Sequence, residues 1–103
     1  MSRMIAELFQ KAQKIQSQIA SARQRLAAHR VEAVSPDGAV KVVASGDKQI
    51  VSIEIKEEFQ RTPELAKVVA ETSNEALKKA EAKLKEELNA ALGTAGIHLP
   101  GLF

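Results

Sequence analysis

The stretch MSRMIAELFQKAQKIQSQIASARQRLAAHR, residues 1–30, decides the fold of this 103-residue chain. Its apolar residues recur in steps of three and four, which is typical of a heptad stripe along one face of a single long helix. The stripe consists of Ile5, Leu8, Ala12, Ile15, Ile19, Ala22 and Leu26. A helix of about 28 residues is roughly 40 Å long, too long for a small sheet to cover. We therefore expect this helix to pack along a second long helix, of its own chain or of a partner.

Three short strands are predicted next, over residues 31–35, 40–45 and 50–56. They are separated by the turn sequences Pro36-Asp37-Gly38 and Gly46-Asp47-Lys48. In the third strand Val51, Ile53 and Ile55 alternate with polar residues, which predicts a half-buried antiparallel strand. Because both turns are short, the three strands should form a meander.

A second long helix is predicted after the capping residue Thr62, with Pro63 at its first position and Gly93 at its end. Its packing stripe consists of Leu65, Val69, Thr72, Ala76, Ala80, Leu84 and Leu88. The predicted fold is therefore α+β, a two-layer α-β-β-β-α arrangement with a three-stranded antiparallel meander. We expect one domain over residues 1–93 and an irregular C-terminal tail over residues 94–103.

The two predicted helices are about twice as long as the strands, given the rise per residue of each element. Part of each helix can cover the apolar face of the sheet, and the rest has to project. A projecting apolar stripe is unfavourable on a monomer in water. A twofold homodimer would cover it.

Composition excludes several classes of function. Cysteine is absent, so disulfides, thiol catalysis and cysteine metal sites are excluded. Three Phe and no Trp or Tyr argue against base stacking on aromatic side chains. His29 and His98 are far apart in sequence, which argues against a zinc site. No catalytic triad, phosphate loop or dinucleotide fingerprint is present. We expect no enzyme, no catalytic residue, no metal, no cofactor and no small-molecule substrate.

No apolar run resembles a signal sequence or a membrane span. We therefore expect a cytoplasmic protein with no membrane partner. The helix over residues 1–30 is amphipathic, and a role at a membrane surface is an alternative. Its narrow, Ala-rich apolar face and the absence of Trp make it a weak lipid binder.

Basic charge is concentrated in the first helix. Residues 1–30 carry six Lys and Arg against Glu7 alone, whereas residues 57–92 carry eight Glu against six Lys and Arg. The candidate binding residues are Arg3, Lys11, Lys14, Arg23, Arg25 and Arg30. The heptad places Lys11 and Arg25 on one flank of the stripe, Arg23 and Arg30 on the other, and Arg3 and Lys14 on the outer surface. Such cations can contact nucleic-acid phosphates or pair with the Glu-rich second helix, and charge alone leaves both interpretations open.

Several segments, in this order and spacing, resemble the YbaB/EbfC family of small bacterial nucleoid-associated proteins. They are Leu8-Phe9-Gln10-Lys11-Ala12-Gln13-Lys14-Ile15-Gln16, Gly38-Ala39-Val40-Lys41-Val42 followed by Gly46, Val51-Ser52-Ile53-Glu54-Ile55, Asn74-Glu75-Ala76, and the ending Gly96-Ile97-His98-Leu99-Pro100-Gly101-Leu102-Phe103. The resemblance covers nearly the whole chain. One departure is the seam of the first helix, where the family often uses Met and this chain uses mainly Ile, Leu and Ala.

The resemblance implies a homodimer with helical arms held like tweezers, binding duplex DNA with low sequence preference in the nucleoid. It favours phosphate contact by the six candidate cations, in chromosome organisation or gene regulation. An alternative is a helical-arm chaperone or interaction scaffold similar in outline to prefoldin, which would grip unfolded chains. The apolar residues Met4, Ile5, Leu8 and Phe9 near the helix start make that alternative conceivable.

Overall fold

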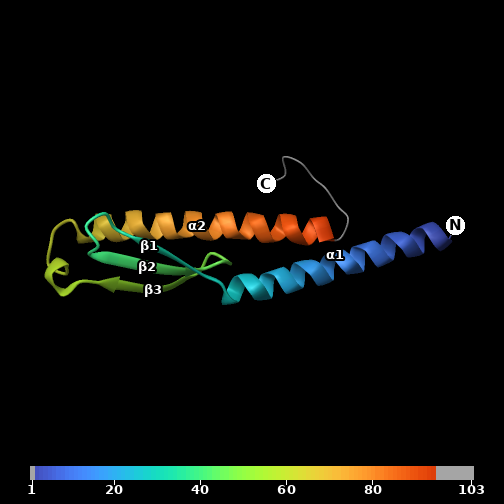
Figure 1. Cartoon of the computed structure of the whole chain (residues 1–103), viewed down its shortest axis with the longest axis horizontal. Helices are drawn as coiled ribbons and strands as arrows, with labels where there is room; N and C mark the ends of the chain where they lie inside the picture. The colour runs from blue at the N-terminus through green and yellow to red at the C-terminus, as the bar shows by residue number, and fades with distance from the viewer. Residues whose placement is uncertain (1, 95–103) are drawn as a thin grey trace.

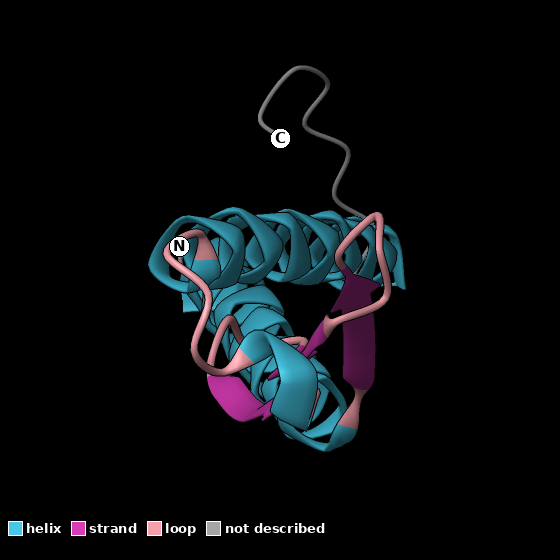
Figure 2. Ribbon diagram, turned by 90° about the vertical axis from the view of Figure 1, so that its left-hand side faces the viewer, coloured by secondary structure: helices cyan, strands magenta, loops and turns pink. Residues whose placement is uncertain are grey.

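The fold is described from a computed structural model, which covers residues 2–94. Its elements are α1 (Ser2–Ala28), β1 (Arg30–Val34), β2 (Val40–Ser45), β3 (Ile50–Ile55), a short 3-10 helix η1 (Glu57–Phe59) and α2 (Leu65–Thr94). Figure 1 shows an elongated molecule, with principal extents of 69 × 24 × 16 Å. Figure 2 looks along the long axis, where both helices and the strands share a narrow cross-section. The predicted α+β order is confirmed.

The start and the end of α2 differ from the prediction. Thr62 and Pro63 precede the helix: the Thr62 hydroxyl donates to the Phe59 carbonyl at 2.9 Å, and the Thr62 carbonyl accepts from the Leu65 amide at 3.3 Å. These two residues therefore complete a turn after η1. The short helix η1 was not predicted from the sequence. Gly93 does not end the helix, because α2 continues to Thr94. A helical glycine costs only about 1 kcal/mol, too little to stop a helix by itself. The predicted tail lies outside the described residues, apart from Thr94 in α2.

The three strands form one antiparallel sheet in the order β1-β2-β3. In the β1–β2 pairing Ala33 lies opposite Val42, and in the β2–β3 pairing Val42 lies opposite Ile53. The register between β2 and β3 shifts at Val43 and Ala44, which is the irregularity of a β-bulge. Both predicted turns join neighbouring strands, so the meander is confirmed.

The first turn is organised by the carboxylate of Asp37. This carboxylate accepts a hydrogen bond from the Ser35 hydroxyl at 2.7 Å and another from the Ala39 amide at 3.0 Å. The bond from Ser35, followed by that from Ala39, lowers the pKa of Asp37 below its usual value. Gly38 follows with a φ of 74°, a left-handed conformation that favours glycine.

The core lies where α2 crosses β1 and β2. Small side chains dominate the contact, which lets the helix lie close to the sheet. The buried cluster comprises Ala33, Val40, Val42, Ala44, Ala76 and Ala80. The predicted stripe of α2 is confirmed, because each of its seven residues is buried or half-buried.

The prediction that β3 is half-buried is wrong for the single chain. Ile50, Val51 and Ile53 expose 42%, 48% and 43% of their surface. The reason is that α2 lies over β1 and β2, so the same face of the edge strand β3 has no helix above it. An apolar surface therefore remains open on β3.

The C-terminal part of α1 packs against the C-terminal part of α2, where Ala22, Leu26 and Ala91 are buried. Gly46, in the turn after β2, fixes this junction. Its amide donates to the carbonyl of Leu26 at 2.9 Å and to that of His29 at 3.1 Å. A Cβ on Gly46 would lie 2.9 Å from the Leu26 carbonyl oxygen, so only glycine allows this approach.

Candidate nucleic-acid interface

The N-terminal part of α1 projects beyond α2 (Figure 1). The ion pair between Arg25 and Glu87, 3.1 Å long, places these residues at the same level of the two antiparallel helices. Seven residues further, α2 ends at Thr94, and seven residues earlier α1 has reached Gln18. Residues 2–17 therefore form an overhang, about 24 Å long at 1.5 Å per residue. We call these residues the arm.

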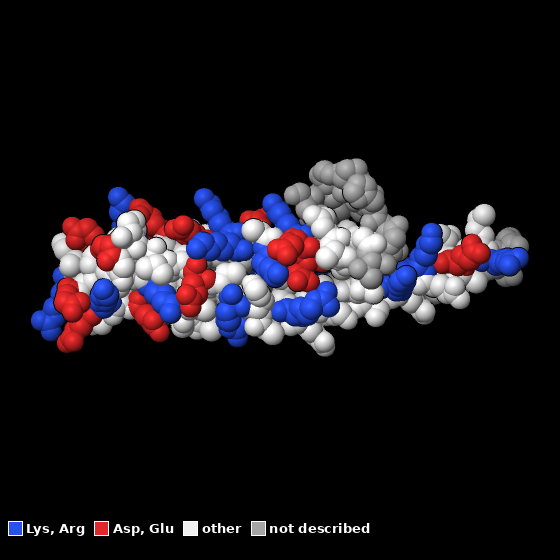
Figure 3. Space-filling view, in the orientation of Figure 1, with Lys and Arg blue, Asp and Glu red and all other residues white. Residues whose placement is uncertain are grey.

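Three of the six candidate cations, Arg3, Lys11 and Lys14, lie on the arm. All three are exposed, and none makes an ion pair with another residue of the range 2–94. The one carboxylate among them is Glu7. Figure 3 shows the projecting part of α1 with blue cationic atoms on both sides of a single red group. The arm is therefore a slender rod whose three cations are accessible to solvent.

Three cations of α1 are spaced by eleven residues, a regularity that the seven-residue heptad does not reveal. Arg3, Lys14 and Arg25 are each eleven residues apart, which is close to three whole turns of an α-helix. They consequently form one row along α1, about 16 Å apart at 1.5 Å per residue, with Lys11 beside it. The heptad assignment placed Arg3 and Lys14 on the outer surface and Arg25 on a flank, and so it separated three residues that form one row. The eleven-residue spacing in the sequence is the signal that shows this row.

The other three candidates lie outside the arm and in different settings. Arg25 is held by Glu87 of α2, as in the interpretation that flank cations pair with the second helix. Arg30 donates to the carbonyls of Ala27 at 2.7 Å and His29 at 3.2 Å, so it completes the end of α1. Arg23 is exposed on the opposite flank of the helix.

Glu87 is a shared acceptor at the junction of the helices. Its carboxylate accepts from Arg25 and also lies 3.6 Å from the Lys83 ammonium. The hydrogen bond from Arg25 is the main cause that lowers the pKa of Glu87 below its usual value. Glu87 exposes only 17% of its side chain. Its carboxylate is therefore largely shielded from solvent, whereas the cations of the arm are exposed.

Most cations of α2 already have partners. Lys67 pairs with Glu71, Lys85 with Glu81, and Lys83 with Glu86 and Glu87. The Lys79 ammonium donates to the Glu32 carbonyl at 2.8 Å. Figure 3 shows red and blue groups interspersed over this half of the molecule. Of the five Lys residues of α2 three pair with a carboxylate, whereas of the five Lys and Arg residues of α1 only Arg25 does so among residues 2–94.

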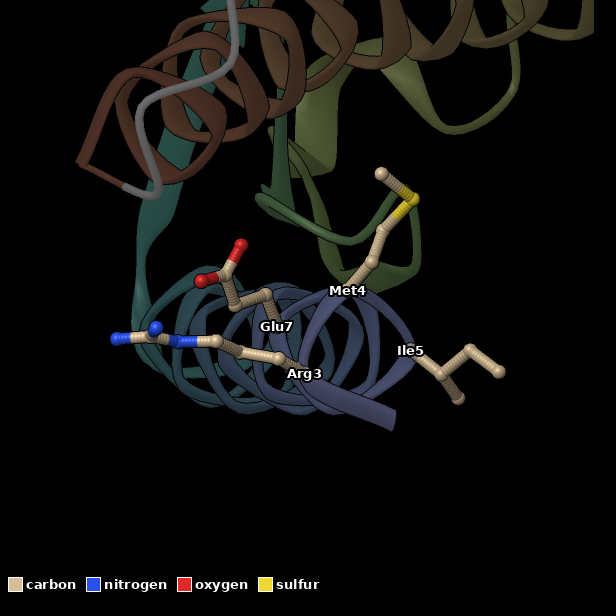
Figure 4. Close-up of a pocket in the computed structure, with 4 residues that line it drawn as sticks. All are labelled: Arg3, Met4, Ile5 and Glu7. Atoms are coloured by element: carbon tan, nitrogen blue, oxygen red, sulfur yellow. The ribbon is translucent and has the colours of Figure 1, made fainter. Parts of the chain in front are cut away.

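The tip of the arm carries a hollow lined by Arg3, Met4, Ile5 and Glu7. Figure 4 shows that these side chains leave the helix in different directions, with Arg3 and Ile5 on opposite sides. They do not converge on a common point, as a small-molecule site requires. Within residues 2–94, no group of three His, Asp or Glu side chains could hold a metal ion. Neither helix of this range is both long and apolar enough to cross a membrane.

Comparison with known proteins gives consistent matches. The YbaB/EbfC DNA-binding family matches residues 1–95. A nucleoid-associated protein of Pelotomaculum thermopropionicum is 36% identical over 102 residues, covering 96% of this chain and 95% of the relative. One of Geobacillus kaustophilus is 40% identical over 83 residues, covering 76% and 73%. The chain belongs to the YbaB/EbfC DNA-binding family.

A solved structure supports the fold of this family member. The chain resembles the uncharacterized protein HP0035 of Helicobacter pylori with a TM-score of 0.75 at 17% identity, covering 86% of this chain and 94% of the other. The family match over residues 1–95, together with the relatives above, confirms the resemblance to the YbaB/EbfC family. In this member the arm is the part of the described structure where exposed cations project beyond the neighbouring helix α2.

Proposed function

We propose that this YbaB/EbfC protein is a nucleoid-associated protein that binds duplex DNA as a homodimer in the cytoplasm. The arms would contact phosphates with low sequence preference. The single observation that supports this most strongly is the contrast in pairing: Arg3, Lys11 and Lys14 have no carboxylate partner within residues 2–94, while Lys67, Lys83 and Lys85 do. The names of the relatives, nucleoid-associated proteins, agree with it.

Phosphate contact requires cations that can approach the backbone of DNA from solvent, and each contact releases condensed counterions. Residues on the arm meet this requirement, because the neighbouring helix α2 has ended there. Arg23 adds a further exposed cation. Arg25 and Arg30 are the least available, since each already donates within its own chain. The proposal involves no catalytic residue and no cofactor.

Salt dependence tests this mechanism directly. Binding to a mixed-sequence duplex, measured by fluorescence anisotropy from 50 to 200 mM salt, should weaken steeply. The double variant Lys11→Gln with Lys14→Gln should lower the slope of log affinity against log salt by about 2. The matched control is Lys67→Gln with Lys85→Gln, which removes the same charge from paired positions of α2. Equal losses in both variants, or no binding at the lowest salt, would contradict the proposal.

The homodimer is supported by the open apolar surface of β3. Ile50, Val51 and Ile53 form an exposed apolar edge, and a second copy is the usual way to cover such a surface. Sedimentation should give the mass of a dimer for the wild-type chain and for the control Ser52→Asp, which lies opposite Val43 and on the other face of the sheet from Ile53. Ile53→Asp should shift the mass toward the monomer. A monomeric wild-type protein at micromolar concentration would refute this part.

A second candidate function is a helical-arm chaperone or scaffold, favoured by the exposure of Leu8 and Phe9, at 62% and 66%. Such an arm could grip apolar segments of unfolded chains. The test is suppression of aggregation of a denatured client protein by the wild-type chain and by Phe9→Ser. Suppression that is lost in this variant, together with an absence of DNA binding, would favour this candidate over the first.

A further inference from the structure

The apolar stripe of α1 is covered at one end and open at the other. Ala22 and Leu26 are buried against α2, and Ile15 and Ile19 are half-buried. The same face continues along the arm to Leu8 and Met4, which expose most of their surface. Figure 4 shows Met4 pointing to the side on which α2 and the strands lie, while Arg3 points aside. The open stretch therefore continues the surface that α2 covers further along.

The open stretch starts where α2 ends. At that level α1 has reached Gln18, and Met4 lies fourteen residues further out, about 21 Å at 1.5 Å per residue. Residues 95–103 follow α2 directly. Nine residues in an extended conformation span about 30 Å, so this segment is long enough to run along the open stripe to Met4.

The chemistry of the segment matches the stripe. Residues 95–103 contain no Lys, Arg, Asp or Glu, and their apolar residues are Ile97, Leu99, Leu102 and Phe103. We propose that residues 95–103 of the same chain cover the open apolar stripe of the arm. Because they are tethered to the end of α2, their effective concentration at the arm is of order millimolar.

A second arm is a poorer occupant of this stripe. Two arms packed stripe to stripe would bring their Arg3, Lys11 and Lys14 flanks close together, and like charges repel at that distance. The uncharged segment 95–103 adds no such repulsion. It also leaves the cationic flank accessible, because the stripe and the row of Arg3 and Lys14 are different faces of α1.

The absence of cysteine allows a clean cross-linking test in the full chain. The pair Leu8→Cys with Leu99→Cys should form an intramolecular disulfide about tenfold faster than the control pair Gln13→Cys with Leu99→Cys. The tether serves both pairs, but only docking on the stripe holds residue 99 on the face of Leu8. Gln13 is exposed on the opposite side of α1. Equal rates for both pairs would overturn the proposal. Cross-links formed mainly between chains would overturn it in favour of the partner's segment as occupant.

Hydrogen exchange gives an independent measurement without cysteine. In the wild-type chain the amides of residues 5–14 should exchange about tenfold more slowly than in Leu99→Asp with Phe103→Asp, since covering a helix suppresses its local opening. The amides of α2 at residues 72–80 should be equal in both and serve as the internal control. Unchanged exchange along the arm would refute the docking. DNA affinity is not part of either readout, so failure here is distinct from failure of the proposed function.

Discussion

The two helices are similar in length, 27 residues in α1 and 30 in α2, but differ in what surrounds them. α2 lies over β1 and β2 with small side chains, and most of its Lys residues have partners. Among residues 2–94, α1 is packed at its C-terminal end, and its arm exposes large apolar side chains beside cations that form no ion pair within this range. The comparison teaches that α2 builds the fold, whereas the arm of α1 adds little to the packing of the described chain.

The largest contrast should appear between a core side chain and an arm side chain. Val42→Ala leaves a cavity between the sheet and α2, where Val42 is fully buried, and should lower the free energy of unfolding by about 2 kcal/mol. Phe9→Ala should change it by less than about 0.5 kcal/mol. Urea unfolding of both variants measures this. Equal losses would break the comparison, because the side chain of Phe9 would then be packed as tightly in solution as that of Val42.

A smaller effect is expected at the junction between the two regions. Gly46→Ala places a methyl group against the backbone of Leu26 and should lower the free energy of unfolding by about 1–2 kcal/mol. The control is Gly93→Ala, where a Cβ meets no atom within 4 Å, and which should stabilise α2 by up to about 1 kcal/mol. Thermal unfolding separates the two. If Gly46→Ala were neutral, the arm would not be fixed to the sheet by this contact.

The smallest effect concerns the ion pair that links the helices. The pKa of Glu87 is lowered from its reference of 4.5 by Arg25, so the stabilisation is present above that value and is lost as the pH falls through the lower pKa of the folded chain. Glu87→Gln should therefore lower the melting temperature slightly at pH 7 and have little effect below the folded pKa. The control is Glu81→Gln, whose Lys85 partner lies 4.0 Å away on the same helix, and it should lower the melting temperature at pH 7 by less than Glu87→Gln does. If the difference in melting temperature between the wild-type chain and Glu87→Gln stayed the same down to pH 2, the ionised carboxylate of Glu87 would have no such role.

The element order could be predicted from sequence because each signal was local. The steps of three and four in residues 5–26 and the turn residues around Gly38 and Gly46 depend only on neighbours in the chain. The open face of β3 could not be predicted, because alternation in Val51, Ile53 and Ile55 shows that one face is apolar but not whether a helix reaches it. That outcome depends on where α2 crosses the sheet.

The candidate site was partly predictable for the same reason. Charge segregation identified the basic helix, and the arm cations Arg3, Lys11 and Lys14 are indeed exposed. Sequence could not tell them from Arg25, because that difference arises from a carboxylate sixty-two residues away. Contact of any of the six with DNA stays a prediction.

The contact between Gly46 and Leu26 gives the arm a pivot. From Leu26 to Arg3 the helix acts as a lever about 35 Å long at 1.5 Å per residue. By simple geometry a tilt of about 10° at the pivot moves the tip by about 6 Å, nearly the width of a DNA minor groove. Substitutions in the β2–β3 turn would thus change the direction of the tip without changing its charge.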